Sequence, residues 1–139
     1  SAWALEERDR WIGWSVADRK IRLHLIVNNS RCLISPWVRI RNLASQSLAL
    51  ASRQIQQDWL RHFCYAPVLL ETFVDLEQYR GTSYKAANWI CLGETKGRGR
   101  QDRHKEYSLS RKAIYLYPLQ KDFRAVLLGE KACKQVLPE

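Results

Sequence analysis

The sequence contains no methionine, and none of its apolar runs approaches the roughly 18–20 residues that cross a membrane. Its first residues, SAWAL, also lack the pattern of a secretory signal peptide. We therefore expect no association with a membrane. Because the chain opens without methionine, we also expect it to be a fragment whose upstream part is missing, and that part could hold half of a site.

Clustered metal ligands are also lacking. The four cysteines are scattered, with no CxxC pair and no histidine at ligand spacing: Cys32, Cys64, Cys91 and Cys133. Zinc sites need grouped soft ligands, so the sequence predicts no metal site. Three of the cysteines have apolar neighbours in sequence, where a thiol behaves as a small hydrophobic side chain. We expect buried, reduced thiols and a cytoplasmic location.

No nucleophile–base–acid triad is visible, because His24, His62 and His104 are far apart in sequence and stand beside no nucleophile. The sequence also contains no internal repeat. What the chain does have is the composition of a globular protein. Its 139 residues are 46% hydrophobic and 27% charged. A chain of this length can bury a proper core, so we expect a single domain over residues 1–139.

Positive charge is the main compositional signal. The formal net charge is +9, and residues 96–112 contain seven basic side chains opposed only by Asp102 and Glu106. Arginine binds phosphate through two parallel hydrogen bonds, and Gly97 and Gly99 allow the backbone to approach a ligand closely. The run predicts contact with nucleic acid or with a phosphate-bearing cofactor, through Lys96, Arg98, Arg100 and Arg103. The alternative is a generic basic surface exposed to solvent.

Hydrophobic patterning predicts an α/β domain, in which helices pack on a sheet of mixed parallel and antiparallel strands (α+β). A charged helical turn over 5–11 and a short helix capped by the S-x-x-D pattern of Ser15 and Asp18 come first. The expected order is then strand, strand, helix, strand, helix, strand, strand, over residues 23–27, 31–38, 42–57, 68–75, 81–88, 89–95 and 113–119. Residues 58–65 are expected to form a connector, and the tail from Gln120 gives no clear signal.

The junction between the second strand and the first long helix is a candidate anion site. Arg39 and Arg41 stand just before Asn42, which could cap the helix, and helix N-termini offer unpaired N–H groups to anions. The alternative is a pair of ordinary solvated arginines.

Tyr84 and Glu71 are candidate catalytic residues. Tyr84 lies early in the expected helix over 81–88, where it either packs in the core or donates a proton to a leaving thiolate. Glu71 lies inside the apolar stretch VLLETFV, where a carboxylate needs a partner or a functional reason. It is either a general base or, as we favour, the ion-pair partner of an arginine.

Aromatic residues are numerous, with six tryptophans. We expect five of them to build core: Trp11, Trp14, Trp37, Trp59 and Trp89. The tyrosines near the basic run are the better candidates for stacking on bases, namely Tyr107, Tyr115 and Tyr117.

Four segments resemble the DruA family of the Druantia anti-phage defence system, which has related domains in proteins found near transposases. They are RDRWIGWS (8–15), LHLIVNNSRCLISPWVRIRNLAS (23–45), PVLLETFVD (67–75) and GTSYKAANWICLGETKGRGR (81–100). The resemblance spans most of residues 3–119. In that family further sequence precedes the matching region, which agrees with the expectation of a truncated chain.

The order of elements also resembles, more remotely, the second half of the GCN5-related N-acetyltransferases. Residues 39–44 resemble the Arg/Gln-x-x-Gly-x-Gly/Ala loop that binds the pyrophosphate of acyl-coenzyme A there, except that Asn42 replaces the first glycine. This resemblance implies an acyl-coenzyme A N-acyltransferase topology. It also implies acetyl-coenzyme A or another acyl-coenzyme A as cofactor, bound by Arg39, Arg41, Asn42 and Ala44. Tyr84 would then be the general acid.

Two functions therefore compete. The first is a domain associated with anti-phage defence or mobile elements that binds nucleic acid through the Arg/Gly run, with other defence or transposition proteins as partners. The second is an acyl-coenzyme A-dependent N-acyltransferase with a degenerate pyrophosphate loop. The basic run favours the first and the junction before the long helix favours the second. We favour the binding domain, because Asn42 departs from the cofactor pattern.

Overall fold

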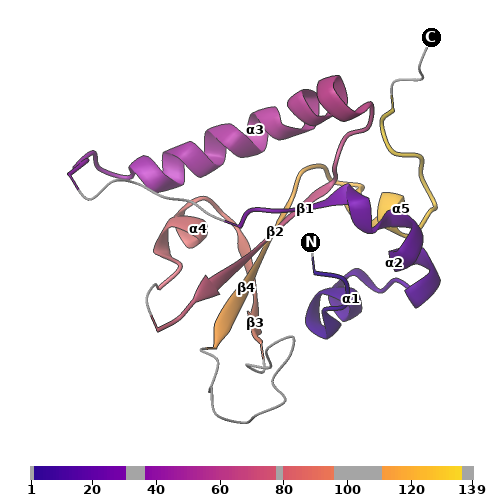
Figure 1. Cartoon of the computed structure of the whole chain (residues 1–139), viewed down its shortest axis with the longest axis horizontal. Coiled ribbons are helices and arrows are strands. Elements are labelled where there is room, and N and C mark those ends of the chain that lie inside the picture. Colours follow the sequence, from indigo (N-terminus) through magenta and orange to yellow (C-terminus); the bar gives the residue numbers. More distant parts are fainter. Residues whose placement is uncertain (1, 31–36, 78–79, 96–110, 136–139) are drawn as a thin grey trace.

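The computed structural model describes residues 2–30, 37–77, 80–95 and 111–135 (Figure 1). The elements in chain order are α1 (Glu6–Ile12), α2 (Val16–Arg22), the 3₁₀ turn η1 (Leu23–Leu25), β1 (Ile26–Asn28), α3 (Leu43–Phe63), β2 (Leu69–Asp75), α4 (Thr82–Ala86), β3 (Ile90–Glu94), β4 (Lys112–Pro118) and α5 (Phe123–Leu127). Within these ranges, no helix combines the length and the apolar character needed to cross a membrane.

A four-stranded mixed sheet organises the molecule. The strand order is β1-β2-β4-β3, with β1 parallel to β2 and the two other pairs antiparallel. The parallel pair requires a crossover connection, and α3 lies within that connection. The predicted class, α/β with a mixed sheet and helices packed on it, is confirmed.

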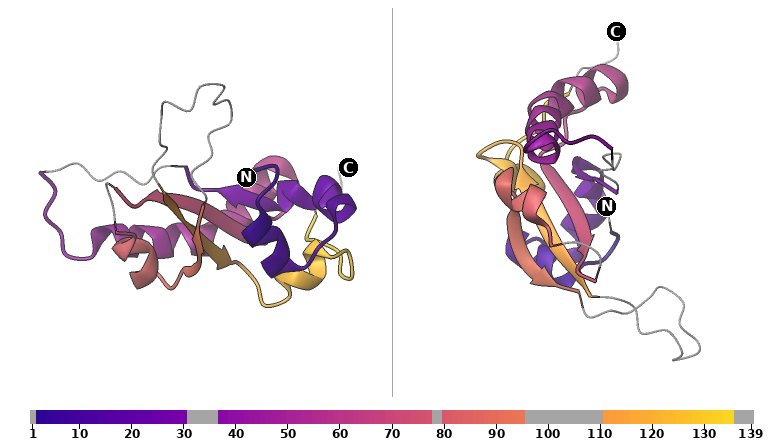
Figure 2. Two further views of the ribbon diagram at one scale, coloured as in Figure 1. Left: turned by 90° about the horizontal axis from the view of Figure 1, so that it is seen from below. Right: turned by 90° about the vertical axis from the view of Figure 1, so that its left-hand side faces the viewer.

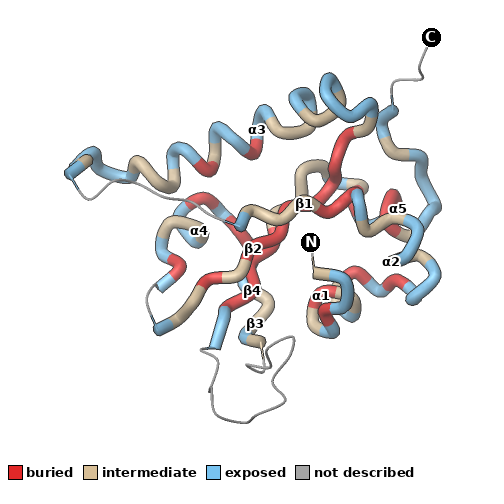
Figure 3. The backbone as a smooth tube through the Cα atoms, in the orientation of Figure 1, coloured by how far each residue is buried: buried red, intermediate tan, exposed pale blue. Residues whose placement is uncertain are grey.

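Side chains alternate between the two faces of the sheet along β2. Leu70 and Val74 belong to one buried cluster with Leu48 of α3, Trp89 and Tyr115. Residues of the opposite face belong to a second buried cluster, with members from α1, η1, β1, β2, β4 and α5: Ile12, Trp14, Leu25, Ile26, Val68, Leu69, Leu116, Phe123, Val126 and Leu127. The sheet therefore separates two hydrophobic cores, and Figure 3 shows β2 and β4 as buried between them.

The helices gather in two groups. In Figures 1 and 2, α1, α2 and α5 lie together beside one end of the sheet, whereas α4 lies next to the N-terminal half of α3. α3 extends along one side of the molecule, and of its 21 residues only Leu48 and Ser52 are fully buried. Most of this helix is therefore available to solvent or to a partner.

Several boundaries differ from the prediction. α3 continues to Phe63, so the expected connector over 58–65 is wrong: Trp59 follows Ile55 by four residues and prolongs the half-buried stripe. Residues 23–25 form a 3₁₀ turn before a short strand, rather than one strand over 23–27. The strand expected over 31–38 lies mostly outside the described residues, and α5 was not predicted.

The structure contradicts the predictions made for four side chains. Cys64 and Cys91 are exposed, the first because it caps the C-terminus of α3 and the second because it lies on the edge strand β3. Trp37 does not build core but is 80% exposed. Tyr115, a predicted stacking residue, is buried on the central strand β4. Trp14 and Trp89 are buried as predicted.

Candidate functional site

The two ends of the basic run are joined to one another. Lys96, Arg98, Arg100 and Arg103 lie outside the described residues, but the strands on either side of them are described. The Thr95 N–H donates to the Lys112 carbonyl at 2.8 Å, and the Lys112 N–H donates to the Thr95 hydroxyl at 3.4 Å. The run therefore starts and ends at adjacent positions of the β3–β4 hairpin.

The described basic residues at this hairpin are weakly neutralised. Arg111 is highly exposed, and its Nη1 lies 3.8 Å from Oε2 of Glu94, whose side chain is also exposed. Exposed pairs at such distances contribute little. Lys112 is exposed and makes no ion pair within the described ranges. Both cations can therefore bind an anionic ligand with little loss of free energy from existing ion pairs.

The start of α3 brings together the residues predicted to bind a cofactor. Arg39, Arg41 and Asn42 are exposed, and Ala44 is half-buried. Asn42 has the left-handed backbone (φ 58°) and makes no capping hydrogen bond through its side chain, so it occupies the N-cap position without the predicted cap. Its carbonyl instead accepts hydrogen bonds from the Gln46 N–H and the Ser45 hydroxyl, both at 3.0 Å.

Tyr84 lies where β1 leaves the sheet. Its ring stacks on Tyr115, with 5.7 Å between centroids, and meets the edge of Trp89 at 5.0 Å. Its hydroxyl accepts a hydrogen bond of 3.2 Å from the side-chain amide of Asn29, the residue that follows β1. Tyr84 is half-buried in this aromatic cluster, and its hydroxyl faces the start of the crossover to α3.

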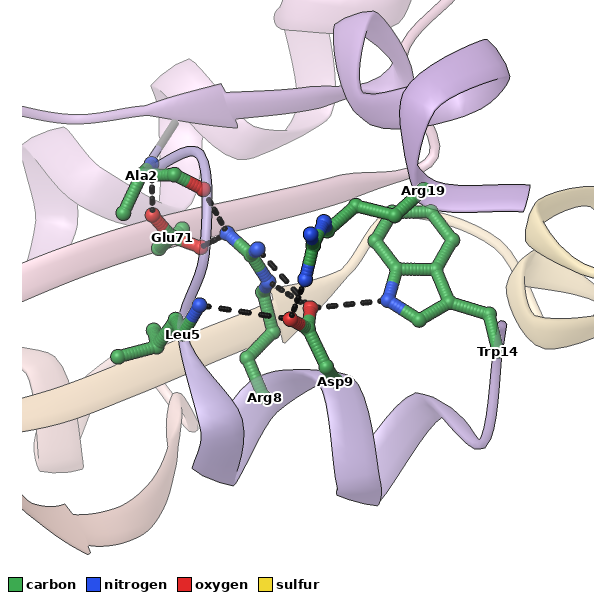
Figure 4. A network of polar contacts seen from close by, with 7 residues as sticks. All are labelled: Ala2, Leu5, Arg8, Asp9, Trp14, Arg19 and Glu71. Carbon is green, nitrogen blue, oxygen red and sulfur yellow. Dashed lines mark hydrogen bonds and ion pairs between the residues drawn. The ribbon is translucent and has the colours of Figure 1, made fainter. Parts of the chain in front are cut away.

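Glu71 is fully buried and ion-paired. Arg8 Nη1 lies 2.7 Å from Glu71 Oε2, and neither side chain has any exposed surface. The Ala2 N–H donates to the other carboxylate oxygen at 3.0 Å (Figure 4). Of the two alternatives for Glu71, these contacts support pairing with an arginine.

The two predicted catalytic residues lie on opposite faces of the sheet. Glu71 pairs across the strands with Leu116 and faces α1, whereas Tyr84 packs on Tyr115, the next residue along β4 and a member of the other cluster. Adjacent residues of a strand point to opposite faces. The structure therefore does not bring Glu71 and Tyr84 into one site.

A polar network around Asp9 was not predicted from the sequence. Asp9 accepts hydrogen bonds of 2.9 Å from Trp14 Nε1, Arg19 Nη1 and Arg8 Nη2 (Figure 4). Burial alone would raise the pKa of Asp9, but the Trp14 and Arg19 hydrogen bonds and the Arg8 charge outweigh burial and lower that pKa. The segment RDRW places Arg8 beside Asp9, but the other two partners, Trp14 and Arg19, are brought to Asp9 by the packing of α1 and α2.

Within the ranges that the structure describes, no three His, Cys, Asp or Glu side chains form a group that could bind a metal ion.

Comparison with known families gives a match over most of the chain. The family model of the Druantia protein DruA matches residues 1–106. The chain belongs to the DruA family. The match covers every element from α1 to β3 and part of the basic run. Membership of the DruA family implies a role in Druantia anti-phage defence, with partners within that defence system. No curated protein and no solved structure matches this DruA-family chain.

Proposed function

We propose that this DruA-family domain binds nucleic acid, and that the basic run over residues 96–112 makes the main contact. The run carries seven basic and two acidic side chains, a net charge of +5 out of +9 for the whole chain. This concentration of charge is the observation that carries the proposal. Phosphate contacts of this kind supply most non-specific affinity for nucleic acid.

The carboxylates of the described residues support the same proposal, because many of them are already engaged elsewhere. Ion pairs join basic residues to acidic ones around α1, α2 and α5: Arg10–Glu6, Arg8–Asp9, Arg8–Glu71, Arg19–Asp9, Arg22–Asp18 and Lys131–Asp122. Five basic side chains on that side of the molecule are thus paired, whereas Lys20, Lys121 and Arg124 make no ion pair with a described residue. Around the hairpin, Glu94 makes only a long, exposed contact with Arg111, and Asp75, the partner of Lys112 in the strand register, makes no ion pair with a described residue.

The hairpin also gives the run a defined base. The hydrogen bonds between Thr95 and Lys112 fix where the run leaves the sheet and where it returns. The Leu76 N–H donates to the Arg111 carbonyl at 3.1 Å, which ties the same base to the end of β2. Anchoring both ends lowers the entropy that a ligand-binding loop loses on binding.

Oligonucleotide binding tests the proposal. We expect Arg98→Ala combined with Arg100→Ala to weaken binding of a labelled oligonucleotide, measured by fluorescence anisotropy over a series of salt concentrations. Loss of two phosphate contacts should reduce the slope of log K against log salt by about 1.4 for a single strand and about 1.8 for a duplex.

The matched control is Arg10→Ala combined with Lys131→Ala. It removes the same two charges from exposed side chains that are already paired with Glu6 and Asp122. The proposal fails if Arg98→Ala with Arg100→Ala leaves affinity and salt slope unchanged, if the control lowers both equally, or if the wild-type chain binds no oligonucleotide at low salt.

A second candidate function is acyl transfer, favoured by the position of the Tyr84 hydroxyl at the end of β1. There it faces the connection that leads to Arg39, Arg41 and Asn42. Calorimetry and thermal unfolding with acetyl-coenzyme A test this function. A bound cofactor raises the melting temperature in proportion to the logarithm of its concentration. If millimolar acetyl-coenzyme A gives no heat of binding and no shift in melting temperature, acyl transfer is excluded as a function of this chain.

A further inference from the structure

A second basic region of the chain lacks carboxylates altogether. Residues 19–57 contain no Asp or Glu, but they contain seven basic residues, namely Arg19, Lys20, Arg22, Arg31, Arg39, Arg41 and Arg53. The net charge of this stretch is +7, and that of residues 96–112 is +5, so the rest of the chain has a net charge of −3. All of the excess positive charge therefore lies in two segments.

Within residues 19–57, three of the four described cations without an ion pair lie just before α3 or at its middle, and the fourth, Lys20, lies in α2. Arg19 and Arg22 are neutralised by Asp9 and Asp18. Arg39, Arg41 and Arg53 are exposed, and none makes an ion pair with another described residue. The first carboxylate of α3 is Asp58, in the last turns of the helix.

Large apolar side chains are exposed among these arginines. Trp37 is 80% exposed and Ile40 is 62% exposed, and Trp37 makes no ring contact with any other described aromatic residue. Exposed tryptophan is unfavourable in water, and its enrichment at interfaces reflects the large area that it buries when a partner covers it. Figure 3 shows this segment exposed at the free end of α3, away from both hydrophobic cores.

The outer surface of α3 is compatible with a polyanion. Its exposed side chains before Asp58 are neutral or basic: Gln46, Ser47, Leu50, Ala51, Arg53, Gln54 and Gln57. Such a surface places no negative charge opposite a phosphate backbone, and its amide and hydroxyl groups can donate hydrogen bonds to phosphate oxygens.

We infer that residues 37–57 form a second nucleic-acid contact, specific for unpaired strands, in which Trp37 stacks on a base and Arg39, Arg41 and Arg53 bind phosphates. The inference rests on the proposed function of this domain as a nucleic-acid-binding protein. Single strands are favoured because the faces of bases are covered by their neighbours in a duplex, whereas an unpaired base offers a free face to an aromatic ring. The protein would thus recognise single-stranded segments as well as negative charge.

Substitution of Trp37 tests the stacking contact. We expect Trp37→Ala to weaken binding of a labelled oligothymidylate about 5- to 150-fold, which is the range for loss of one base–aromatic stack, and to leave a blunt duplex of equal length nearly unaffected. Trp37→Phe should retain most of the affinity, because phenylalanine also stacks. Phe63→Ala, at the other end of α3 and 56% exposed in the wild type, is the matched control and should bind as the wild type does.

The arginines are tested through the salt dependence. Arg39→Ala combined with Arg41→Ala should lower the salt slope for the single strand by about 1.4, whereas Trp37→Ala should leave that slope unchanged. Thermal unfolding of each variant verifies that the fold is retained.

The outcomes separate the two proposals. If Arg98→Ala with Arg100→Ala weakens binding but the variants at residues 37, 39 and 41 do not, the second contact is wrong and the proposed function stands. Equal losses for single strand and duplex in Trp37→Ala also overturn the single-strand contact. If no variant changes binding, or if the wild type binds no oligonucleotide, both proposals fail. If residues 37–57 bind an acidic protein instead of nucleic acid, the variants at residues 37, 39 and 41 should leave oligonucleotide binding unchanged.

Discussion

Arg8 of α1 and Glu71 of β2 form an ion pair of 2.7 Å, although 63 residues separate them and neither side chain has any exposed surface. The Arg8 guanidinium also donates to the Ala2 carbonyl at 2.8 Å and to Asp9 Oδ1, so it is bonded on several sides. This pair fixes α1 and the residues before it against the centre of the sheet.

Breaking this pair should destabilise the protein strongly. We expect Arg8→Met to lower the free energy of unfolding by about 3–5 kcal/mol, because it leaves the Glu71 carboxylate buried without its counter-charge. Urea denaturation followed by circular dichroism measures the change. Arg8→Met combined with Glu71→Leu should recover much of the loss, because an apolar pair of similar volume removes both buried charges.

The exposed pair Arg10–Glu6 on the same helix is the control for this prediction. Arg10→Ala should change the free energy of unfolding by less than about 1 kcal/mol. A loss in Arg8→Met no larger than that in Arg10→Ala would show that Arg8 and Glu71 are not a buried pair in solution.

The Asp9 network makes stability depend on acidity. The pKa of Asp9 is lower in the folded protein than the value of about 3.9 expected in the unfolded chain. As the pH falls, Asp9 is therefore protonated first in the unfolded state. The contribution of Asp9 to the free energy of unfolding is complete above the pKa of the unfolded chain, and it is lost as the pH falls towards the pKa of the folded protein. We expect Asp9→Asn to destabilise the protein at neutral pH and the difference from the wild type to shrink below about pH 4. Urea titrations at a series of pH values measure this difference, and a difference independent of pH contradicts the prediction.

The capping box of α2 is a prediction from the sequence that the structure confirms. The Asp18 N–H donates to Ser15 Oγ at 3.1 Å, and the Ser15 N–H donates to Asp18 Oδ2 at 3.5 Å. Ser15→Ala should cost about 1 kcal/mol of unfolding free energy, because it leaves a helix N–H without its side-chain acceptor. Ser47→Ala, in an exposed position inside α3, should be neutral or slightly stabilising. Equal effects of the two substitutions in thermal unfolding would rule out the cap.

Local patterns made the fold class predictable. The stretch VLLETFV reads as a buried strand because it is apolar and β-rich, and β2 covers it almost entirely. The expected strands over 89–95 and 113–119 differ from β3 and β4 by one residue at each end. The strand pattern depends only on residues that are close together in sequence, so it could be recognised without the structure.

Contacts between distant segments were not predictable. The need of Glu71 for a partner followed from its apolar surroundings, but the choice of Arg8 among many arginines depends on how α1 packs on the sheet. Trp37 was expected in the core because tryptophan is apolar, yet its position before α3 lies beyond the edge of both hydrophobic clusters. The loop residues Lys96, Arg98, Arg100 and Arg103 lie outside the described residues, so their role stays a prediction.

A close approach to Tyr115 makes Gly81 sensitive to substitution. Gly81 has φ +70°, and a Cβ at this position would lie 2.5 Å from Tyr115 Oη and 2.9 Å from its ring carbon Cζ. Tyr115 is buried on β4 and cannot move aside easily, and Gly81 opens the helix that carries Tyr84. We expect Gly81→Ala to cost more than about 2 kcal/mol, since a clash adds to the ~1–2 kcal/mol of a left-handed alanine.

Gly13→Ala separates the clash from the backbone effect, because Gly13 has a similar φ of +82° but open space around its missing Cβ. We expect it to cost only the ~1–2 kcal/mol of the left-handed conformation. Tyr115→Phe, which removes the hydroxyl that the new methyl group would meet first, should make Gly81→Ala less costly when the two are combined. A double-mutant cycle by urea denaturation measures this coupling. If Gly81→Ala costs no more than Gly13→Ala, and Tyr115→Phe does not change its cost, the tight contact between α4 and β4 does not exist.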